Sequence, residues 1–523
     1  MNKWIFIICL VSVSILKAQD FHAWVYFNDK PNVAVSLANP STILTQDAID
    51  RKARHGVIID ERDVPMNQTY VDQVKTAPGI TYKTQSKWFN CVHVTGNASD
   101  INALEALAFV DRVEFAAATQ NRPALSNEKE TTTGTNSINY GTSRGQIEML
   151  GLDELHDGGF TGSSVKVAIL DSGFPNIPTN PGFSRLINQN GILGGYDFVD
   201  RNDIYFDDNF HGARVLSVMA GSESGNFEGA APDASYYLFR TEEDAQETPA
   251  ELSYWVAAAE RADSLGVQVI NVSLGYLNFD NPSESLTYND LNGSSSFITR
   301  GANVAFEKGM AVVVSAGNSG RSNTHPFISA PADALGAFAI GSVNSSEQRS
   351  PFSSIGPTAD GRIVPDVMAQ GTSTASIDEI GNVVGSSGTS FSAPLISAAI
   401  ACLMQAFPDQ TPAQIYDLVR QSSSNASSPD NFLGYGIPDF GQIYQLLSGR
   451  NESLESNDFY VDGKNVVFAL SENEKQYKIL AMNGQLVHHG TLNGSVLDLS
   501  QLRTGIYLIQ LNNIGKYSKL ILR

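Results

Sequence analysis

Residues 140–448 alternate short apolar runs with amphipathic segments, and this alternation restricts the fold more than any other feature of the chain. The apolar runs are rich in β-branched residues and end near Gly, Ser or Asn, as buried strands do. They are 165–170, 267–274, 310–316 and 337–343. Segments with helical periodicity stand between them, at 250–265 and 298–308. Strands that alternate with helices predict an α/β domain, in which helices cover both faces of a parallel sheet.

Polar residues with catalytic potential stand at the carboxyl ends of the expected strands, where such a sheet gathers its active groups. Asp171 follows the run 165–170, Asn318 follows the run 310–316, and His211 begins an amphipathic stretch. Taken singly, each has an ordinary interpretation, because Asp and Asn are common in turns and His is common at a helix end. A function rests on finding them together.

A turn of small residues, Gly-Ser-Ser-Gly-Thr-Ser-Phe-Ser-Ala-Pro at 385–394, leads directly into the apolar stretch 395–407. Glycine lets the backbone turn sharply and lets a substrate approach closely. The start of a helix adds unpaired N–H groups and a positive dipole end, which stabilise an oxyanion. Ser390 is expected at that start, with its hydroxyl presented as a candidate nucleophile.

Together, these four residues supply the parts of a serine nucleophile site. A serine becomes nucleophilic when an imidazole takes its proton, and a carboxylate on the other ring nitrogen sets the tautomer. A side-chain amide can donate to the oxyanion that then forms. The chain order is Asp171, His211, Asn318 and Ser390. Asp–His–Ser is the order in subtilisin and differs from the orders in chymotrypsin and the α/β-hydrolases.

Five segments within 165–394 resemble the signature blocks of the subtilase (subtilisin-like) serine peptidases: VAILDSGF, HGARVLSVMAG, VINVSLG, VVVSAGNSG and GTSFSAP. The resemblance implies a subtilisin-like α/β fold and an endopeptidase that hydrolyses peptide bonds through an acyl-enzyme. It implies that Asp171 orients His211, which is the general base and then the general acid. It also implies that Ser390 is the nucleophile, and that Asn318 and the Ser390 backbone N–H form the oxyanion hole.

The same resemblance assigns two substrate-binding stretches and a substrate class. Ser273, Leu274 and Gly275 match the strand that pairs with an extended peptide, and Ser315, Ala316 and Gly317 match the opposite wall of the specificity pocket. Pairing through the main chain tolerates many sequences, so side-chain pockets set the selectivity. The expected substrates are proteins or peptides, and the chemistry requires no cofactor.

The chain departs from the family pattern after His211-Gly212, where Ala213 and Arg214 replace the usual Thr and His. This departure motivates an alternative, a catalytically weakened subtilase-fold surface or binding protein. A nucleotide-binding α/β enzyme is a further alternative. It is disfavoured because no expected strand is followed by Gly-x-Gly-x-x-Gly or by a phosphate loop with Lys.

The N-terminal region divides into three parts. Residues 1–19 have the positive start and short apolar run of a secretory signal. Residues 20–120 combine strand-like runs with helical patches and predict a small α+β domain. They stand where subtilases carry an inhibitory propeptide, and WVYFNDKP and SKWFNCVHV resemble Bacteroidetes-type subtilases; the alternative is a permanent accessory domain. The polar stretch 121–139 is expected to be an exposed linker that is open to cleavage.

Residues 455–523 contain alternating strands with Asn-Gly turns at 483–484 and 493–494, which predict a small antiparallel β-sandwich. KILAMNGQLV, LDLSQLRTGIYLIQL and the closing KLILR resemble the C-terminal sorting domain of type IX secretion substrates. The resemblance implies export through the periplasm to the cell surface or the medium, with the type IX machinery as a partner. The alternative is a small carbohydrate- or protein-binding sandwich.

The charge of the chain excludes one class of partner and leaves one ligand open. The 34 Lys and Arg against 55 Asp and Glu give a formal net charge of −21, which argues against a nucleic-acid surface. The acidic stretch 197–203 with 207–208 offers oxygens for a structural calcium ion, although a solvated loop explains it as well. No His/Cys spacing indicates zinc. No segment reaches about 18 apolar residues, so no transmembrane anchor is expected in the mature chain.

Overall fold

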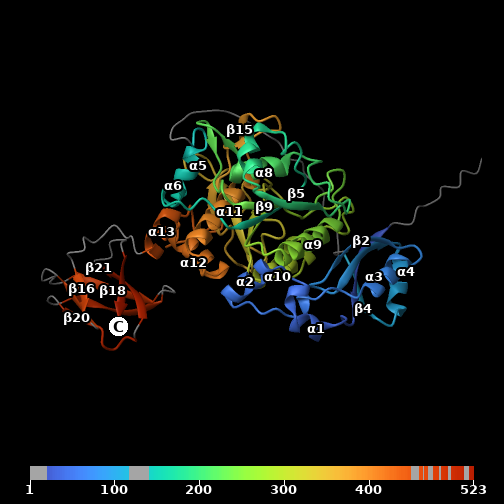
Figure 1. The fold of residues 1–523 in the computed structure, drawn as a ribbon, viewed down its shortest axis with the longest axis horizontal. Helices are drawn as coiled ribbons and strands as arrows, with labels where there is room; N and C mark the ends of the chain where they lie inside the picture. The colour runs from blue at the N-terminus through green and yellow to red at the C-terminus, as the bar shows by residue number, and fades with distance from the viewer. Residues whose placement is uncertain are drawn as a thin grey trace, which may run out of the picture.

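The computed structural model describes residues 20–116, 140–448 and most of 459–522 (Figure 1). Within the last range, 463, 469–474, 482–484, 493–495, 504 and 512–516 are not described. The predicted signal 1–19, the linker 121–139 and both predicted Asn-Gly turns lie outside the described residues. The three described ranges correspond to an N-terminal, a central and a C-terminal domain, and their exact boundaries stay predictions.

The central domain is built on a seven-stranded parallel sheet with the order β13-β12-β11-β10-β5-β9-β6. The strands are β5 Lys166–Asp171, β6 Ile192–Asp197, β9 Ser235–Arg240, β10 Val269–Val272, β11 Ala311–Ser315, β12 Ala337–Val343 and β13 Val367–Gln370. The chain adds strands on one side of β5 and then crosses to β10 on its other side. The switch point of the sheet therefore lies between β5 and β10, and in open α/β sheets this is the place where ligands bind.

Helices cover both faces of this sheet (Figure 1), as the alternation of the sequence predicted. The helices are α5 Arg144–Glu148, α6 Leu152–Asp157, α7 Ser184–Asn188, α8 His211–Ala220, α9 Ala250–Ser264, α10 Phe297–Glu307, α11 Thr389–Ala406, α12 Pro412–Ser422 and α13 Phe440–Ser448. Val167 and Ile169 of β5 pack into a core with α8 and α11, whereas Ala168 and Leu170 pack into a second core with α9 and α10. Neighbouring strand residues thus face opposite helical layers.

Two hairpins complete the described part of the central domain. They are β7 Ser222–Glu223 with β8 Phe227–Glu228, and β14 Thr374–Ile377 with β15 Val383–Ser386. The second hairpin leads directly into α11 and packs against α8, where the Ile377 N–H donates to Ser217 Oγ at 2.8 Å. It therefore connects the helix that begins at His211 with the helix that carries Ser390.

The N-terminal domain is a four-stranded antiparallel sheet with helices, which confirms the predicted α+β class. Its elements are β1 Phe21–Phe27, α1 Val33–Ala38, α2 Gln46–His55, α3 Gln68–Lys75, β2 Thr81–Ser86, β3 Cys91–Gly96, α4 Ala98–Ala103 and β4 Val110–Phe115, in the sheet order β2-β3-β1-β4. Directly after α4 the chain continues as a 3₁₀ turn at Leu104–Ala106.

The N-terminal domain packs against α9 and α10, on the outer side of the second core (Figure 1). Trp24 of β1 stacks on Phe297 of α10 with ring centroids 4.6 Å apart. The Trp24 Nε1–H also donates to Ser253 Oγ of α9 at 2.7 Å. Two helices of the central domain are therefore enclosed between two sheets.

The C-terminal domain consists of two antiparallel sheets, with the orders β16-β17-β20 and β19-β18-β21-β22. The strands are β16 Phe459–Asp462, β17 Asn465–Phe468, β18 Lys475–Ala481, β19 Leu486–Leu492, β20 Val496–Asp498, β21 Gly505–Leu511 and β22 Tyr517–Leu522. Val466 and Leu497 of the first sheet share one core with Ile479 and Ile509 of the second. This arrangement confirms the predicted small β-sandwich.

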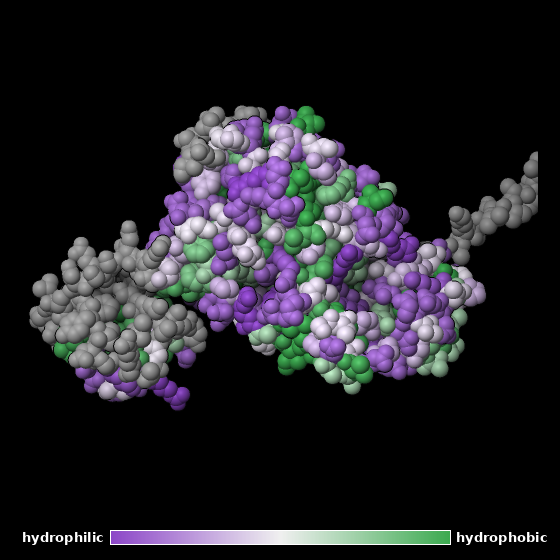
Figure 2. All heavy atoms as spheres, in the orientation of Figure 1, coloured by the Kyte–Doolittle hydropathy of each residue, from purple (hydrophilic) through white to green (hydrophobic). Residues whose placement is uncertain are grey.

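Hydrophilic side chains predominate on the face shown in Figure 2, and hydrophobic side chains are scattered in small groups. Among the described residues, one helix, α11, is long and apolar enough to cross a membrane. It is 83% buried inside the central domain, so its composition reflects its place in the core.

Candidate active site

The four candidate catalytic residues come together around the switch point of the central sheet. Asp171 is the last residue of β5, and His211 is the first residue of α8. Asn318 lies three residues beyond the end of β11, and Ser390 is the second residue of α11. Residues that are far apart in the sequence thus share one edge of the sheet.

Asp171 and His211 form a buried carboxylate–imidazole pair. The distance from His211 Nδ1 to Asp171 Oδ1 is 2.7 Å. Asp171 is fully buried, whereas the His211 side chain is 28% exposed. A carboxylate only accepts hydrogen bonds, so Nδ1 carries the proton and Nε2 keeps its lone pair. The Ser172 N–H donates to the same carboxylate oxygen at 2.8 Å and helps to hold it in place.

The start of α8 is held close to the end of β5. Asn209 Oδ1 accepts a hydrogen bond from the His211 backbone N–H at 2.9 Å. Gly212 is required by the close approach, because a Cβ there would lie 2.4 Å from the Gly173 carbonyl oxygen and 2.9 Å from Asp171 Cβ. A side chain at position 212 would push the helix away and separate the imidazole from its carboxylate.

Ser390 is tied to Ser273 by two reciprocal hydrogen bonds. Ser390 Oγ donates to the Ser273 carbonyl at 3.0 Å, and Ser273 Oγ donates to the Ser390 carbonyl at 2.8 Å. Pro394 lies four residues after Ser390 inside α11 and has no N–H to give to that carbonyl. Ser273 satisfies the carbonyl that Pro394 leaves open. The next residue, Phe391, has its ring centroid 5.8 Å from that of His211, which brings the imidazole beside the serine turn.

Asn318 is oriented by Thr389, a residue that the sequence analysis did not assign. Asn318 Oδ1 accepts from the Thr389 N–H at 2.9 Å and from Thr389 Oγ1 at 3.0 Å. Because the oxygen of the amide is held in this way, Nδ2 is directed away from Thr389 as a donor. Gly388, with φ 145°, has a backbone that disfavours other residues. A Cβ there would lie 3.5 Å from Asn318 Nδ2. The Thr within Gly-Thr-Ser was the signal that could have identified this role.

The two candidate substrate-binding stretches lie on neighbouring strands. Ser273, Leu274 and Gly275 directly follow β10, whereas Ser315 ends β11 and Ala316 and Gly317 follow it. The two strands are paired in parallel, and Ser315 Oγ donates to the Leu274 carbonyl at 3.3 Å. The structure thus brings both stretches to the same edge of the sheet as Ser390. Ser273 has the additional contact with the serine that the sequence did not indicate.

The two residues that depart from the family pattern have different surroundings. Ala213 is buried in the core that contains α8 and α11, where its methyl group has apolar neighbours. The Arg214 guanidinium lies over the Phe210 ring at 4.5 Å and pairs with Glu379 at 2.8 Å. Glu379 belongs to the turn between β14 and β15. Arg214 therefore fastens the start of α8 to the hairpin that leads to Ser390.

Glu242 is a buried acid behind the site that the sequence analysis also missed. Burial raises its pKa to about 8, although a hydrogen bond from the Tyr276 hydroxyl opposes that rise. Asp171 adds to the rise as a nearby negative charge. Burial thus favours the protonated form of Glu242.

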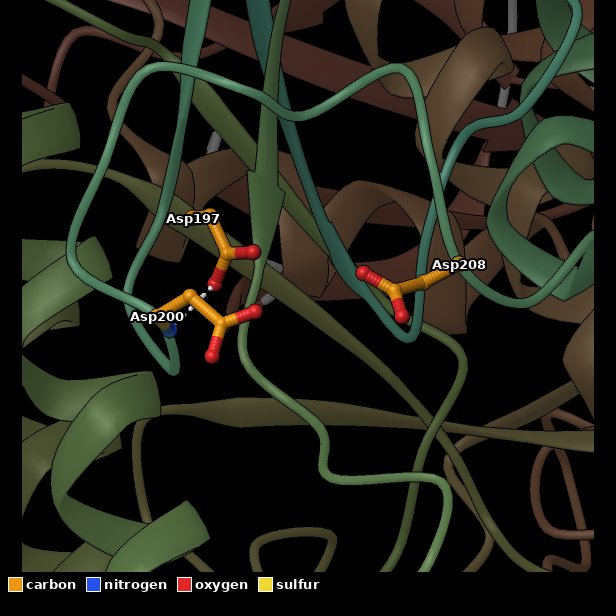
Figure 3. A group of neighbouring side chains, drawn as sticks. All are labelled: Asp197, Asp200 and Asp208. Atoms are coloured by element: carbon orange, nitrogen blue, oxygen red, sulfur yellow. Dashed lines mark hydrogen bonds between the residues drawn. The ribbon is translucent and has the colours of Figure 1, made fainter.

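The acidic loop does not fit a calcium ion. Asp197, Asp200 and Asp208 converge (Figure 3), and among the described residues they are the one group of three close enough to share a metal. Arg240, however, already pairs with all three. Its Nη1 lies 2.8 Å from Asp197 and 3.0 Å from Asp200, and its Nε lies 3.0 Å from Asp208. The second Asp197 oxygen accepts two backbone N–H groups at 2.9 Å. A guanidinium occupies the position that a cation would need.

The described geometry agrees with the comparison to known families. The model of the subtilase family matches residues 162–436, which is more than half of the chain. This chain belongs to the subtilase family of serine peptidases. The described pair Asp171–His211 and the turn at Ser390 both lie inside the matched region.

Curated relatives give the same assignment. Subtilisin NAT of Bacillus subtilis subsp. natto is 31% identical over 290 residues, which is 55% of this chain and 66% of that protein. The match therefore spans slightly less than two thirds of that relative. Subtilisin of Bacillus pumilus is 30% identical over 294 residues, covering 56% of this chain and 94% of that protein. Among solved structures, MycP1 from Mycobacterium smegmatis is 24% identical, covers 60% of this chain and 88% of its own, and has a TM-score of 0.47.

Two further family models match the flanking regions of this subtilase. Residues 22–133 match the peptidase S8 propeptide domain of Bacteroidota. Residues 459–523 match the secretion system C-terminal sorting domain. Both flanking resemblances stated from the sequence are confirmed.

Proposed function

We propose that this subtilase is an exported endopeptidase that hydrolyses peptide bonds through an acyl-enzyme. The Ser390 hydroxyl turns from the Ser273 carbonyl toward His211 Nε2, which takes its proton as the oxygen attacks the substrate carbonyl. Asp171 holds the imidazole and stabilises its protonated form. Asn318 Nδ2 and the Ser390 backbone N–H donate to the oxyanion. His211 then gives its proton to the leaving amine, and a water molecule that His211 activates in the same way releases the acyl group.

The observation that supports this proposal most strongly is the 2.7 Å contact of His211 Nδ1 with the buried Asp171, at the sheet edge that also carries Ser390. The orientation of the Asn318 amide by Thr389 supports an oxyanion role. The exposed backbone at Gly275, on the edge beside Ser390, suits pairing with an extended peptide. The substrates are therefore proteins or peptides, and these side chains supply the chemistry without a metal.

The flanking domains suggest a route of maturation and export. We infer that the N-terminal domain is an inhibitory propeptide, which is released by cleavage within 121–139. The C-terminal sandwich would direct the chain through the type IX machinery to the cell surface or the medium. The presence of this domain in a chain that also has the signal-like segment 1–19 supports export through the periplasm.

Covalent labelling with a fluorophosphonate tests the chemistry directly. We expect the processed protein to be labelled at one serine and the label to be lost in Ser390→Ala. A matched variant in the same turn, Ser387→Ala, should keep the label. A correctly processed wild-type protein that takes no label would instead support the alternative, a catalytically weakened subtilase-fold surface or binding protein. Ala213 and Arg214 are the residues that motivate that alternative.

A further inference from the structure

A segment of the N-terminal domain reaches the end of the central sheet opposite to the candidate active site. This docking segment, residues 44–66, contains α2 and contacts residues that precede the central strands. Asp47 pairs with Lys166, the first residue of β5, and Arg51 donates to the carbonyl of Val267, just before β10. Asp171 ends β5 five residues after Lys166, or about 17 Å along a strand. The contacts between the docking segment and the central domain therefore lie far from the serine site.

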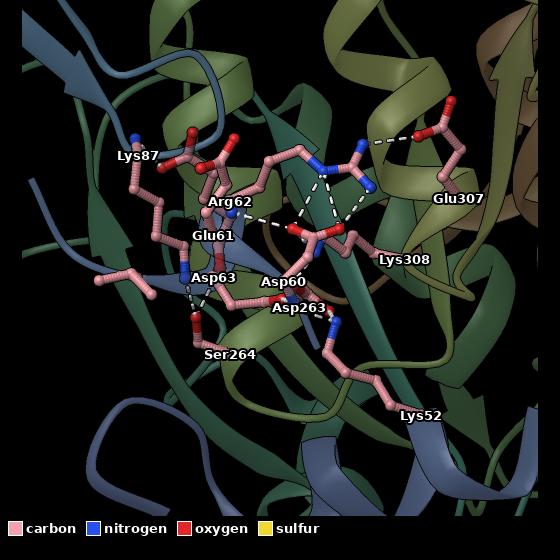
Figure 4. Close-up of polar contacts among 12 residues, drawn as sticks. Lys52, Asp60, Glu61, Arg62, Asp63, Lys87, Asp263, Ser264, Glu307 and Lys308 are labelled. Atoms are coloured by element: carbon pink, nitrogen blue, oxygen red, sulfur yellow. Dashed lines mark hydrogen bonds and ion pairs between the residues drawn. The ribbon is translucent and has the colours of Figure 1, made fainter. Parts of the chain in front are cut away.

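The docking segment brings charged side chains into the interface. The interdomain charge network consists of six of them: Arg51, Lys52, Asp60 and Asp63 of the docking segment, and Asp263 and Lys308 of the central domain. Most of them are visible in Figure 4. Five are 3% exposed or less, and Asp60 is 31% exposed. Among these six, three positive and three negative charges balance. At the exposed edge of the network Asp60 also pairs with Arg62, which forms an ion pair with Glu307 of the central domain at 2.6 Å.

Each central-domain charge is neutralised by residues of the docking segment. Asp263 Oδ1 pairs with Lys52 Nζ at 2.7 Å and also with the Arg51 guanidinium. Lys308 Nζ lies 2.6 Å from Asp63 and 2.9 Å from Asp60. Burial acts to raise the pKa of Asp263, but Arg51 and Lys52 outweigh it and hold the pKa below its usual value. The acid therefore stays ionised and depends on these cations.

A buried charge network of this kind contributes specificity more than affinity. Two charges that leave water lose much of their hydration, and their mutual attraction does little more than offset that loss. A partner that fails to present the matching charge leaves an uncompensated buried ion, which is strongly unfavourable. Any segment that replaced 44–66 would need a cation pair opposite Asp263 and an acid pair opposite Lys308.

We propose that Asp263 and Lys308 form a recognition site, remote from the catalytic residues, by which the peptidase domain selects its own N-terminal domain. The partner is an N-terminal domain with the Arg51–Lys52 pair and the Asp60–Asp63 pair. The site holds that domain independently of the serine site and of the covalent linker, and it rejects propeptides with other charges. The proposal rests on the proposed function only in treating the N-terminal domain as separable.

The test uses the full-length chain with Ser390→Ala and a recognition sequence for a site-specific protease inserted within 121–139. Size-exclusion chromatography and interferometry then measure whether the N-terminal domain stays bound after the cut. When all network residues are unchanged, we expect the cut N-terminal domain to co-elute with the rest of the chain. Lys52→Met should raise the dissociation constant by about 10²–10³-fold, because it breaks a buried pair. Asp47→Asn is the matched control, since its pair with Lys166 is exposed, and should change the constant less than about 5-fold.

A double substitution separates recognition from general destabilisation. Asp263→Asn combined with Lys52→Met should weaken binding much less than the product of the two single effects, because the partners act on one another. The linker keeps the domains together at an effective concentration of about 1 mM before the cut. Near-ultraviolet circular dichroism of the uncut chains therefore checks folding. If Lys52→Met does not fold, two other variants replace it. Lys52→Arg keeps the charge and should change the dissociation constant little, whereas Asp63→Asn removes a charge and should raise the constant strongly.

Three results would overturn the proposal: loss of the N-terminal domain at once after the cut, equal effects of Lys52→Met and Asp47→Asn, or effects that simply multiply in the double variant. None of these readouts requires peptidase activity, since the serine is replaced and the added protease makes the cut. A failure of the proposed catalytic function would appear in the fluorophosphonate experiment and would leave these binding measurements unchanged.

Discussion

Asp171 and Asp263 are both fully buried carboxylates of the central domain, yet they stand at opposite ends of its sheet and have different partners. Asp171 contacts the imidazole of His211, a ring that can both donate and accept a proton. Asp263 contacts the Arg51 guanidinium, whose charge is permanent, and the Lys52 amine, whose pKa is lowered by burial although Asp263 and Asp63 oppose that fall. The same burial therefore serves two purposes. An imidazole partner makes proton transfer possible, and cationic partners make a fixed contact between domains.

The largest expected effect comes from removing the charge of Asp171. In Asp171→Asn the amide would hold the wrong imidazole tautomer, so turnover should fall by about 10⁴-fold. The measurement is kcat with a peptide substrate, on protein whose near-ultraviolet circular dichroism equals that of the wild type. A fall smaller than about 10-fold would mean that the Asp171–His211 pair has only a structural role.

The next effect concerns the oxyanion. Asn318→Ala should lower kcat by about 10²–10³-fold with little change in KM, because the amide acts mainly in the transition state. Thr389→Val removes the hydroxyl that holds Asn318 Oδ1 but keeps the backbone N–H contact, so it should lower kcat by about 10-fold. Equal effects of the two substitutions would contradict the assignment of Thr389 as a positioning residue.

Two buried histidines at the interface between the N-terminal and central domains provide a test with titratable groups in place of ion pairs. His22 Nδ1 lies 2.9 Å from His93 Nε2, and His93 Nδ1 contacts Ser253 Oγ at 2.7 Å. Burial, with Lys83, lowers the pKa of His22 to about 4, and burial lowers the pKa of His93 well below its ordinary 6.5. Glu284 accepts the His22 backbone N–H at 2.9 Å.

The sign of the pH effect follows from these lowered pKa values. Between about pH 6.5 and pH 4 the unfolded chain binds more protons than the folded chain. The contribution of the two histidines to the free energy of unfolding is therefore fully present above about pH 6.5 and decreases as the pH is lowered through this range. His22 should remove about 2 kcal/mol at pH 5, and His93 should add to this loss. Urea unfolding of the full-length Ser390→Ala chain at pH 7 and pH 5 measures this loss. His93→Gln should reduce the difference, and an unchanged difference would show that other groups cause it.

The smallest expected effect concerns Arg214 and Glu379, an ion pair that is partly exposed. Arg214→Ala should lower kcat/KM by about 5- to 10-fold, since such pairs contribute about 1 kcal/mol. Glu379→Gln should have a similar effect, and the double variant should be little worse than either single variant. The kinetic measurement also decides whether the departure from the family pattern weakens the enzyme. Additive losses would mean that Arg214 acts through Phe210 alone.

The sequence alone was sufficient to predict the architecture of the central domain. Burial and periodicity are local properties, so the apolar runs predicted β5, β10, β11 and β12, but not β6, β9 and β13, and the residues at the strand ends indicated the candidate site. The C-terminal sandwich and the N-terminal α+β domain were predictable for the same reason. The catalytic roles of Asp171, His211 and Ser390 stay predictions, but the structure brings Asp171 to His211 and the Ser390 turn beside it, as the sequence required.

Only the tertiary structure decided which distant side chains meet. Arg240 lies between the three aspartates that suggested calcium, although it is more than thirty positions from each of them in the chain. Ser273 meets Ser390 across 117 residues, and Lys52 meets Asp263 across more than two hundred. A local pattern records whether a residue is buried and how its neighbours repeat. A local pattern does not record the order of strands in a sheet or the docking of domains, which decide whether an Asp lies against a histidine, an arginine or a metal.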